Sequence, residues 1–272
     1  MQHYFTWQHS TIYYRTEGSG PVVVLLHGFA EDGHIWDEQL NYLQRSFRVI
    51  VPDLPGSGRS GILQKEFADV TMENYADCIH ALLKHEQVIH CTMFGHSMGG
   101  YITLSFAEKY PQQLRAFGLV HSTAFADTGE KKQNRLKGIK LMEEYGVYAF
   151  IKSTTPNLFA TKFKQEQPGK IEALIEAGKQ FTTEALQQYY RAMMNRTDKT
   201  SVLAGSKLPA LFISGEEDLA APLTDVLQQV HLPEISYIHI LNNTGHMGIW
   251  ESADTVNSYL YQFCSSMNDM NV

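Results

Sequence analysis

Short apolar runs rich in β-branched residues alternate along the chain with longer stretches of helical periodicity. Val22–Leu26 is apolar without interruption, which is typical of a strand buried on both faces of a sheet. Similar runs occur at residues 48–51, 88–94, 117–120, 211–213 and 235–241. Because strands that alternate with helices form parallel sheets covered on both faces, this pattern predicts an α/β fold with a mostly parallel central sheet.

The first residues and the stretches between the runs complete this pattern. Residues 4–7 and 11–15 alternate between apolar and polar side chains before a Gly-Ser-Gly-Pro turn at 18–21, which predicts an edge hairpin. Apolar residues share one helical face in four windows, namely Trp36, Leu40 and Leu43; Tyr75, Ile79, Leu82 and Leu83; Ile102, Phe106 and Tyr110; and Val226, Leu227 and Val230 after Pro222 at an expected first helical position.

Residues 122–205 break the alternation, because they contain helical windows and no convincing strand. The clearest window has apolar residues spaced i, i+3, i+4, i+7 and i+8, at Leu186, Tyr189, Tyr190, Met193 and Met194. We expect this stretch, the cap segment, to be a helical insertion over the edge of the sheet. Residues 1–121 and 206–272, the sheet unit, would then form the rest of a single structural unit.

Charge divides in the same way as secondary structure. The cap segment holds 13 lysines and arginines and nine acids, a net charge of +4, whereas the sheet unit carries −11 and the whole chain −7. A net negative chain disfavours a nucleic-acid or anionic-membrane surface. We expect no membrane span and no secretory signal, and the odd, scattered cysteines Cys78, Cys91 and Cys264 suggest reduced thiols in a cytoplasmic protein.

The strongest local motif is a G-x-S-x-G sequence, Gly95-His96-Ser97-Met98-Gly99, directly after the apolar run that ends at Phe94. Between a strand and a helix this motif is a nucleophile elbow. The turn forces Ser97 into a strained conformation and lifts its hydroxyl clear of the sheet, and side chains at the glycines would clash. The N–H of Met98, at the start of the helix, stays free to meet negative charge.

With this motif the chain resembles the α/β-hydrolase superfamily, and the resemblance covers nearly its whole length. His27-Gly28-Phe29 is similar to the family's oxyanion loop, in which Phe29 would supply the second backbone N–H. Residues 53–60, Asp-Leu-Pro-Gly-Ser-Gly-Arg-Ser, are similar to a structural loop of the family. His27 and His96 belong to the motifs and are expected to support the loops by hydrogen bonds.

The resemblance also implies a base and an acid, in the chain order Ser, acid, His. His246 follows the last apolar run, where open α/β sheets keep their sites, and resembles the family's loop histidine. The family pattern G-x-x-D, with a proline four residues on, selects Asp218. Two alternatives stay open: Glu216 or Glu217 could serve instead, or the acid could follow the earlier strand, with Asp127 the nearest candidate.

Other residues are candidates for the substrate pocket. His121 lies at a strand end and Tyr190 on the clearest helix of the cap segment. Arg135, Arg191 and Arg196 could bind an acidic group of a substrate, and Arg191 is favoured because it follows Tyr190 directly. No histidine, cysteine or carboxylate pattern suggests a metal site, and the proposed chemistry needs no cofactor.

The sequence therefore predicts a serine hydrolase that acts on a small molecule, most simply a carboxylic ester, lactone or thioester, through an acyl-enzyme. Three alternatives stay open. The same residues could cleave a carbon–carbon bond, or act as an aminopeptidase of the proline-iminopeptidase kind. The fold could also serve as a ligand-binding receptor, although a receptor has no need of Ser97, Asp218 and His246. The sequence does not indicate an oligomeric state.

Overall fold

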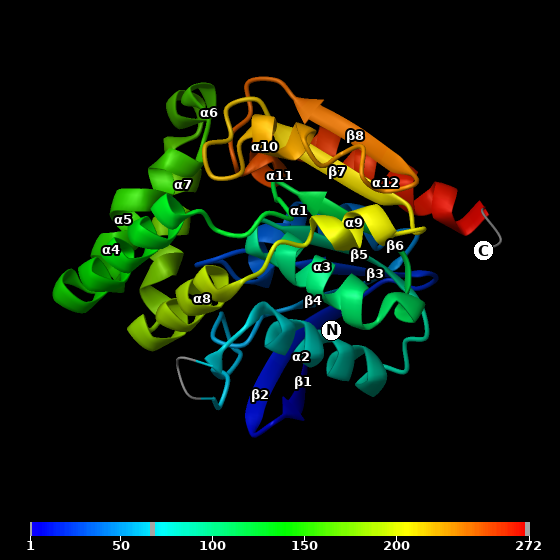
Figure 1. The fold of residues 1–272 in the computed structure, drawn as a ribbon, viewed down its shortest axis with the longest axis horizontal. Coiled ribbons are helices and arrows are strands. Elements are labelled where there is room, and N and C mark those ends of the chain that lie inside the picture. The colour runs from blue at the N-terminus through cyan, green and yellow to red at the C-terminus, as the bar shows by residue number, and fades with distance from the viewer. Residues whose placement is uncertain (1, 66–68, 270–272) are drawn as a thin grey trace.

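The computed structural model describes residues 2–65 and 69–269, and an eight-stranded sheet runs through it in the order β1-β2-β4-β3-β5-β6-β7-β8 (Figure 1). Strands β1 and β2 form the predicted hairpin, and β2 pairs antiparallel with β4. All other neighbouring strands are parallel. The predicted α/β fold with a mostly parallel sheet is confirmed.

The strands are β1 Gln2–Trp7, β2 Ser10–Glu17, β3 Val22–Leu26, β4 Arg48–Pro52, β5 Cys91–His96, β6 Leu114–Val120, β7 Ala210–Gly215 and β8 Ser236–Leu241. The helices of the sheet unit are α1 Asp37–Leu43, α2 Met72–His85, α3 Met98–Lys109, α10 Leu223–Leu227, α11 Gly248–Glu251 and α12 Ala253–Asp269. Those of the cap segment are α4 Gly129–Tyr145, α5 Val147–Thr154, α6 Thr161–Glu166, α7 Pro168–Ala177, α8 Thr183–Asn195 and α9 Thr200–Gly205. Short 3₁₀ helices occur at η1 Gly33–Trp36, η3 Pro111–Gln113, η4 Thr155–Leu158 and η5 Gly178–Gln180.

Each face of the sheet has its own hydrophobic core. Helices α1, α11 and α12 cover one face, where their apolar residues pack on β3, β4 and β7. Helices α2, α3 and α10 cover the other face. The core on this second face continues into α4, α5 and α8, so the cap segment packs on the sheet unit through buried apolar side chains such as Leu186 and Tyr189.

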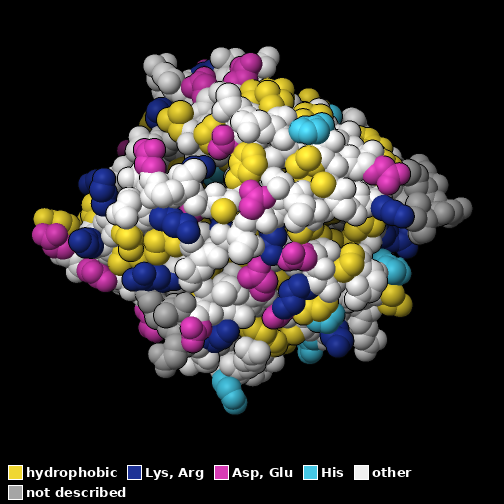
Figure 2. Space-filling model, viewed as in Figure 1, with side chains coloured by type: hydrophobic (Ala, Val, Ile, Leu, Met, Phe, Trp, Pro, Cys, Tyr) yellow, Lys and Arg dark blue, Asp and Glu magenta, His cyan; other side chains and the backbone are white. Residues whose placement is uncertain are grey.

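Every residue from 122 to 205 is described, and none lies in a strand. The six α-helices of this stretch lie between β6 and β7 in the chain. In space, α4 to α8 lie to one side of the sheet, whereas α9 lies beside α3 (Figure 1). Lysines and arginines, mixed with acids, gather on the surface of these helices at the left of Figure 2. Among the described residues, no helix combines the length and apolar character that crossing a bilayer requires.

Three details differ from the sequence predictions. The run at 88–94 forms a strand only from Cys91 to His96, because Val88 donates its N–H to Leu83 O at the end of α2. The run at 235–241 is not buried on both faces, since β8 is the sheet's edge strand and Ile238 and Ile240 are exposed. Pro222 precedes α10 with extended backbone instead of occupying its first turn. The three cysteines are buried and unpaired, as predicted.

Candidate active site

Ser97 lies on a sharp turn between β5 and α3, with a φ of 52° and a ψ of −117°. A positive φ is strained for a residue with a side chain. The flanking glycines make the turn possible. A Cβ on Gly95 would lie 2.1 Å from the carbonyl group of Gly99, and a Cβ on Gly99 would lie 2.5 Å from Leu26 O. The close approach that the motif predicts is therefore present, and it presents Ser97 at the carboxyl end of the central strand.

Two backbone N–H groups flank this serine. Met98 is the first residue of α3, where N–H groups have no acceptor within the helix. Phe29 lies in the loop after β3, next to Gly28, and a Cβ on Gly28 would lie 3.1 Å from Ser97 Cβ. Phe29, Ser97 and Met98 all line one cavity.

Asp218 and His246 lie in contact in the loops that follow β7 and β8. His246 Nδ1 is 3.0 Å and 2.9 Å from the two carboxylate oxygens of Asp218. The backbone N–H groups of Ala220 and Ala221 also donate to Asp218 Oδ1, at 2.9 Å and 2.8 Å. Burial would raise the pKa of this carboxyl, but the charge of His246 and the imidazole hydrogen bonds outweigh it and hold the pKa well below its usual range.

A second imidazole holds the same carboxylate. His121 directly follows β6, and its Nδ1 is 3.1 Å from Asp218 Oδ2. Burial lowers the pKa of His121 to about 4, although the hydrogen bond and charge of Asp218 oppose this shift. His121 is therefore neutral at pH 7 and donates through Nδ1. The sequence analysis places His121 in the pocket wall, and it does line the cavity, but its contact with Asp218 has no signal in the sequence pattern.

A buried ion pair connects the loops around the site. His96 Nδ1 is 3.0 Å from Glu31 Oε2, and His96 Nε2 is 2.9 Å from the carbonyl oxygen of His246. Both ring nitrogens face oxygen atoms, an arrangement that favours the doubly protonated, charged imidazole. Burial opposes the charge on each side chain. The attraction of His96 and the N–H bond from Gly28 nevertheless lower the pKa of Glu31, and the attraction of Glu31 and the bond to the His246 carbonyl raise the pKa of His96. The predicted supporting role of His96 is thus confirmed, and its partner Glu31 was not predicted.

The other predicted supports behave similarly. His27 Nε2 accepts the N–H of Leu54 at 2.8 Å, and its Nδ1 lies 2.8 Å from Gly28 O, so the ring joins the loop after β3 to the loop after β4. Asp53, at the start of that loop, accepts the N–H groups of Gly33 and Arg59, both at 2.9 Å. These contacts agree with the structural role expected for residues 53–60.

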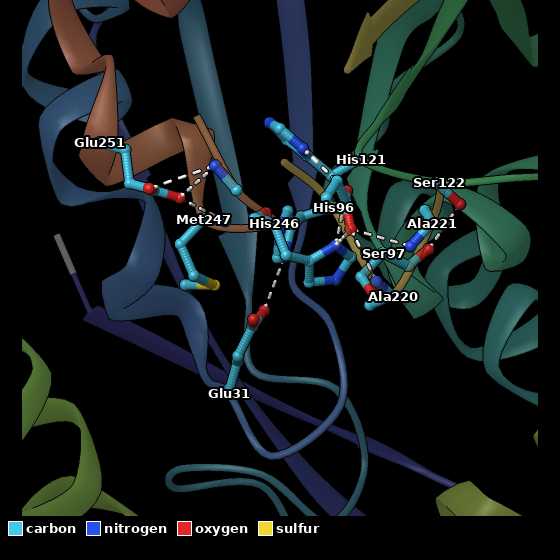
Figure 3. A network of polar contacts seen from close by, with 12 residues as sticks. Glu31, His96, Ser97, His121, Ser122, Ala220, Ala221, His246, Met247 and Glu251 are labelled. Atoms are coloured by element: carbon cyan, nitrogen blue, oxygen red, sulfur yellow. Dashed lines mark hydrogen bonds and ion pairs between the residues drawn. The ribbon is translucent and has the colours of Figure 1, made fainter. Parts of the chain in front are cut away.

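Backbone bonds fix the loop that carries His246. The N–H of His246 donates to Leu158 O in the cap segment at 2.7 Å. The Glu251 carboxylate accepts the N–H of Met247 (Figure 3). It also accepts the N–H groups of Gly245 and Ala160, and Ala160 belongs to the cap segment. The cap segment and the histidine loop are thus joined directly.

The cavity has a volume of about 210 Å³ and lies between the sheet unit and the cap segment. The sheet unit contributes Phe29, Ser97, Met98, His121 and His246 to its wall, and the cap segment contributes Tyr190 among others. Ligand pockets for drug-sized molecules span ~300–1,000 Å³, so this one suits a smaller molecule. The structure therefore brings Ser97 and His246 to one cavity, with Asp218 buried behind the histidine.

Asp127, the alternative acid, is paired with two arginines and has no described contact with His246. Its buried carboxylate is bound by Arg135 and Arg196, and burial, which would raise its pKa, is outweighed by these guanidinium groups, which lower it. Glu216 and Glu217 are exposed, and Glu217 accepts the N–H of Thr161. Of the four candidate acids, Asp218 alone has a described contact with His246.

The structure does not place Arg191, the arginine that the sequence analysis favours, in the cavity wall. Arg191 is not among the described residues that line the cavity, whereas Arg135 and Arg196 are. Successive residues of an α-helix lie about 100° apart around the axis, so Arg191 does not share the inward direction of Tyr190. Arg196 follows the end of α8 in extended conformation, where helical periodicity carries no information.

One group of described side chains is close enough to hold a metal ion, namely His121, Asp218 and His246. Its ligand atoms lie within 4.8 Å of one another, but they already form the imidazole–carboxylate hydrogen bonds described above.

Comparison with known proteins agrees with this geometry. A family model described as the α/β hydrolase fold matches residues 21–150. Lipase 3 of Moraxella sp. (strain TA144) is 26% identical over 256 residues, which cover 89% of this chain and 76% of the lipase. The 2-hydroxy-6-oxo-6-phenylhexa-2,4-dienoate hydrolase of Comamonas testosteroni is 25% identical over 263 residues, which cover 93% of this chain and 90% of that enzyme.

The similarity extends to solved structures. The structure of a thermophilic esterase from Thermogutta terrifontis superposes on this chain with a TM-score of 0.91 and 26% identity. The superposition covers 98% of this chain and 99% of the esterase. The likeness therefore includes the cap segment as well as the sheet.

Proposed function

Since this chain belongs to the α/β-hydrolase superfamily, we propose that it is a serine hydrolase of small carboxylic esters, including lactones and thioesters. The observation that carries the proposal is the contact of His246 Nδ1 with Asp218, in the same cavity wall as a serine on a strained elbow. The esterase and lipase relatives support the same reaction class. We also propose that residues 122–205 act as the cap over this cavity.

The proposed reaction has two steps. In the first, Ser97 Oγ attacks the ester carbonyl carbon, and its proton passes to His246 Nε2. Asp218 holds the imidazole in the tautomer that accepts this proton and stabilises the imidazolium that forms. The tetrahedral intermediate then expels the alcohol, which takes the proton from His246 and leaves an acyl group on Ser97. In the second step, water attacks the acyl carbon through the same base and releases the carboxylic acid.

Negative charge develops on the carbonyl oxygen in both steps. We propose that the backbone N–H groups of Phe29 and Met98 bind this oxyanion. Such donors are effective because they are fixed before the reaction and need not reorient, and removing one typically slows the chemical step by about 10²–10³-fold. The Glu31–His96 ion pair supports the proposal, since it anchors both the elbow and the loop of Phe29.

A second candidate is hydrolysis of a carbon–carbon bond, which is favoured by the similarity to the Comamonas enzyme. The same nucleophile, base and acid would serve, but the leaving group would be a carbanion that must gain a proton on carbon. Turnover of a panel of esters and of a vinylogous 1,5-diketone distinguishes the two candidates, because the esters test ester hydrolysis and the diketone tests carbon–carbon bond hydrolysis.

The test of the main proposal is covalent labelling combined with turnover. A fluorophosphonate probe should label the purified protein at Ser97, and Ser97→Ala should lose labelling and ester hydrolysis, with a fall in kcat of about 10⁴–10⁶-fold. Ser258→Ala on α12, outside the cavity, is the matched control and should retain both. Unchanged ester hydrolysis by the Ser97→Ala protein would exclude the acyl-enzyme mechanism.

A further inference from the structure

Two arginines of the cap segment line the cavity and share one buried acid, Asp127, and together these three residues form a charged cluster. The side chain of Asp127 is fully buried. Arg135 on α4 binds it through Nε and Nη2, and Arg196 after α8 binds it through Nη2 at 2.9 Å. Both arginines line the cavity that also contains Ser97 and His246. The cluster therefore faces the proposed reaction site.

The cluster has more positive than negative charge. One carboxylate balances only one of two guanidinium groups, and a buried charge without a partner is costly. The side chain of Arg196 is 7% exposed, and its Nε is buried without a hydrogen-bond partner among the described residues. Arginine side chains are normally satisfied when buried, so this unpaired donor shows that Asp127 satisfies the guanidinium of Arg196 only in part.

The other charged groups of the cavity do not balance this excess. Glu31 is bound by His96 and by the N–H of Gly28. Asp218 accepts hydrogen bonds from two imidazoles and two backbone N–H groups. Near the cluster itself, Lys131 adds further positive charge and its described ion pair is with Asp225, at 3.7 Å.

From these observations we propose that Arg135 and Arg196 bind a free carboxylate of the substrate, so that the natural substrate is a short ester, lactone or thioester that carries a second, unreacting carboxylate. This inference rests on the proposed ester hydrolysis. A guanidinium fork matches the planar carboxylate, and rings fix both forks in place: Arg135 stacks over Tyr190 and Arg196 over Tyr101, with Cζ 5.2 Å and 4.8 Å from the ring centroids. The small cavity limits such a substrate to a few carbon atoms.

The substrate test compares charged and neutral esters of the same shape. Monoethyl glutarate is matched by ethyl 5-oxohexanoate, in which a methyl ketone replaces the carboxylate on the acyl side. Acetoxyacetate is matched by acetoxyacetone, which does the same on the alcohol side. Hydrolysis is monitored through the protons that it releases. The value of kcat/KM should be higher for the charged member of at least one pair by about 10-fold or more, as expected for a hydrogen bond to a charged group. The pair that shows the preference identifies which side of the ester faces the arginines.

Variants assign the preference to the cluster. Arg196→Gln should bring the charged-to-neutral ratio of kcat/KM close to one, and Arg135→Gln should lower it. The matched control is Lys137→Gln, which removes one exposed positive charge from the same helix, α4, and should leave the ratio unchanged. Because a ratio is measured, partial loss of folded protein does not imitate the effect.

A binding measurement keeps the test independent of turnover and of variants that fail to fold. Glutarate should bind the Ser97→Ala protein in calorimetry, and it should inhibit hydrolysis of ethyl 5-oxohexanoate by the unmodified protein competitively, whereas glutaramide should do neither. Turnover of neutral esters with ratios near one and no glutarate binding would overturn the carboxylate site and leave the proposed function intact. No turnover of any ester would overturn the proposed function, and glutarate binding would then still decide the site.

Discussion

The two sides of the cavity are built from different kinds of secondary structure. On the sheet side, Ser97, His121, Asp218 and His246 each follow a strand of one parallel sheet, so the strand ends bring them together. On the cap side, Arg135 and Arg196 come from a helix and from the residue after a helix. The sheet side is therefore determined by topology, and the cap side by how individual helices pack. We therefore expect the proposed catalytic chemistry to depend on the sheet side and substrate specificity to depend on the cap side.

The largest expected difference between the two sides is the effect of replacing a buried aspartate on each side. Asp218→Asn should lower kcat by about 10⁴-fold in protein that still folds, because an amide offers the imidazole the wrong tautomer. Asp127→Asn should instead destabilise the protein, by about 3–5 kcal/mol, because two buried guanidinium groups lose their shared carboxylate. Ester kinetics and urea unfolding of both variants measure the contrast. If Asp127→Asn abolishes turnover in protein that is still folded, the earlier strand supplies the acid and our assignment is wrong.

The response to acid should also differ between the two sides. All 12 histidines lie in the sheet unit, and none lies in the cap segment. Burial lowers the pKa of His121 to about 4, so the unfolded chain takes up this proton near pH 6.5 while the folded chain does not. The free energy of unfolding should therefore fall as the pH decreases from about 6.5 towards 4, by up to about 3 kcal/mol.

Unfolding midpoints of the wild type and of His121→Asn between pH 7 and pH 4 measure this loss. The asparagine retains a donor for Asp218 but does not titrate, so the variant should lose less stability over that interval. Parallel pH profiles for the two proteins would contradict the assignment to His121. An exposed histidine of the same unit, replaced in His34→Asn, is the control and should follow the wild type.

The smallest effects compare two glycines. Gly95→Ala places a Cβ against the backbone of Gly99 and should cost about 1–3 kcal/mol or more, as overpacking does. Gly169→Ala in α7 meets no atom within 4 Å and should stabilise the cap segment by up to about 1 kcal/mol, because alanine favours the helix. Thermal unfolding should show a lower melting temperature for Gly95→Ala and a higher one for Gly169→Ala than for the wild type. A stabilising Gly95→Ala would mean that the elbow is looser than described.

What the sequence could predict follows from the same contrast. The elbow and the histidine loop were recognisable because close backbone packing restricts which residues can occupy them, and the G-x-S-x-G motif records that restriction. The helices of the cap segment were also recognisable, because apolar periodicity reflects burial on one side. The inward arginines were not, since polar residues follow no period and Arg196 lies beyond the end of its helix. Glu31 was missed for a related reason, because a lone acid in a loop does not reveal the buried imidazole 65 residues later that binds it.

The bond between His246 N–H and Leu158 O has a consequence for motion. If the cap segment swung as a rigid body, it would either break this bond and the one between Ala160 N–H and Glu251 or displace the His246 loop with it. Movements that leave residues 158–160 in place, such as those of α4 and α8, would admit substrate without this disturbance. Local opening of this kind is visible in amide hydrogen exchange. The exchange rate of the His246 amide therefore measures how often the cap segment separates from the His246 loop. Slow exchange at His246 together with faster exchange in α8 would indicate that α8 moves while residues 158–160 stay in place.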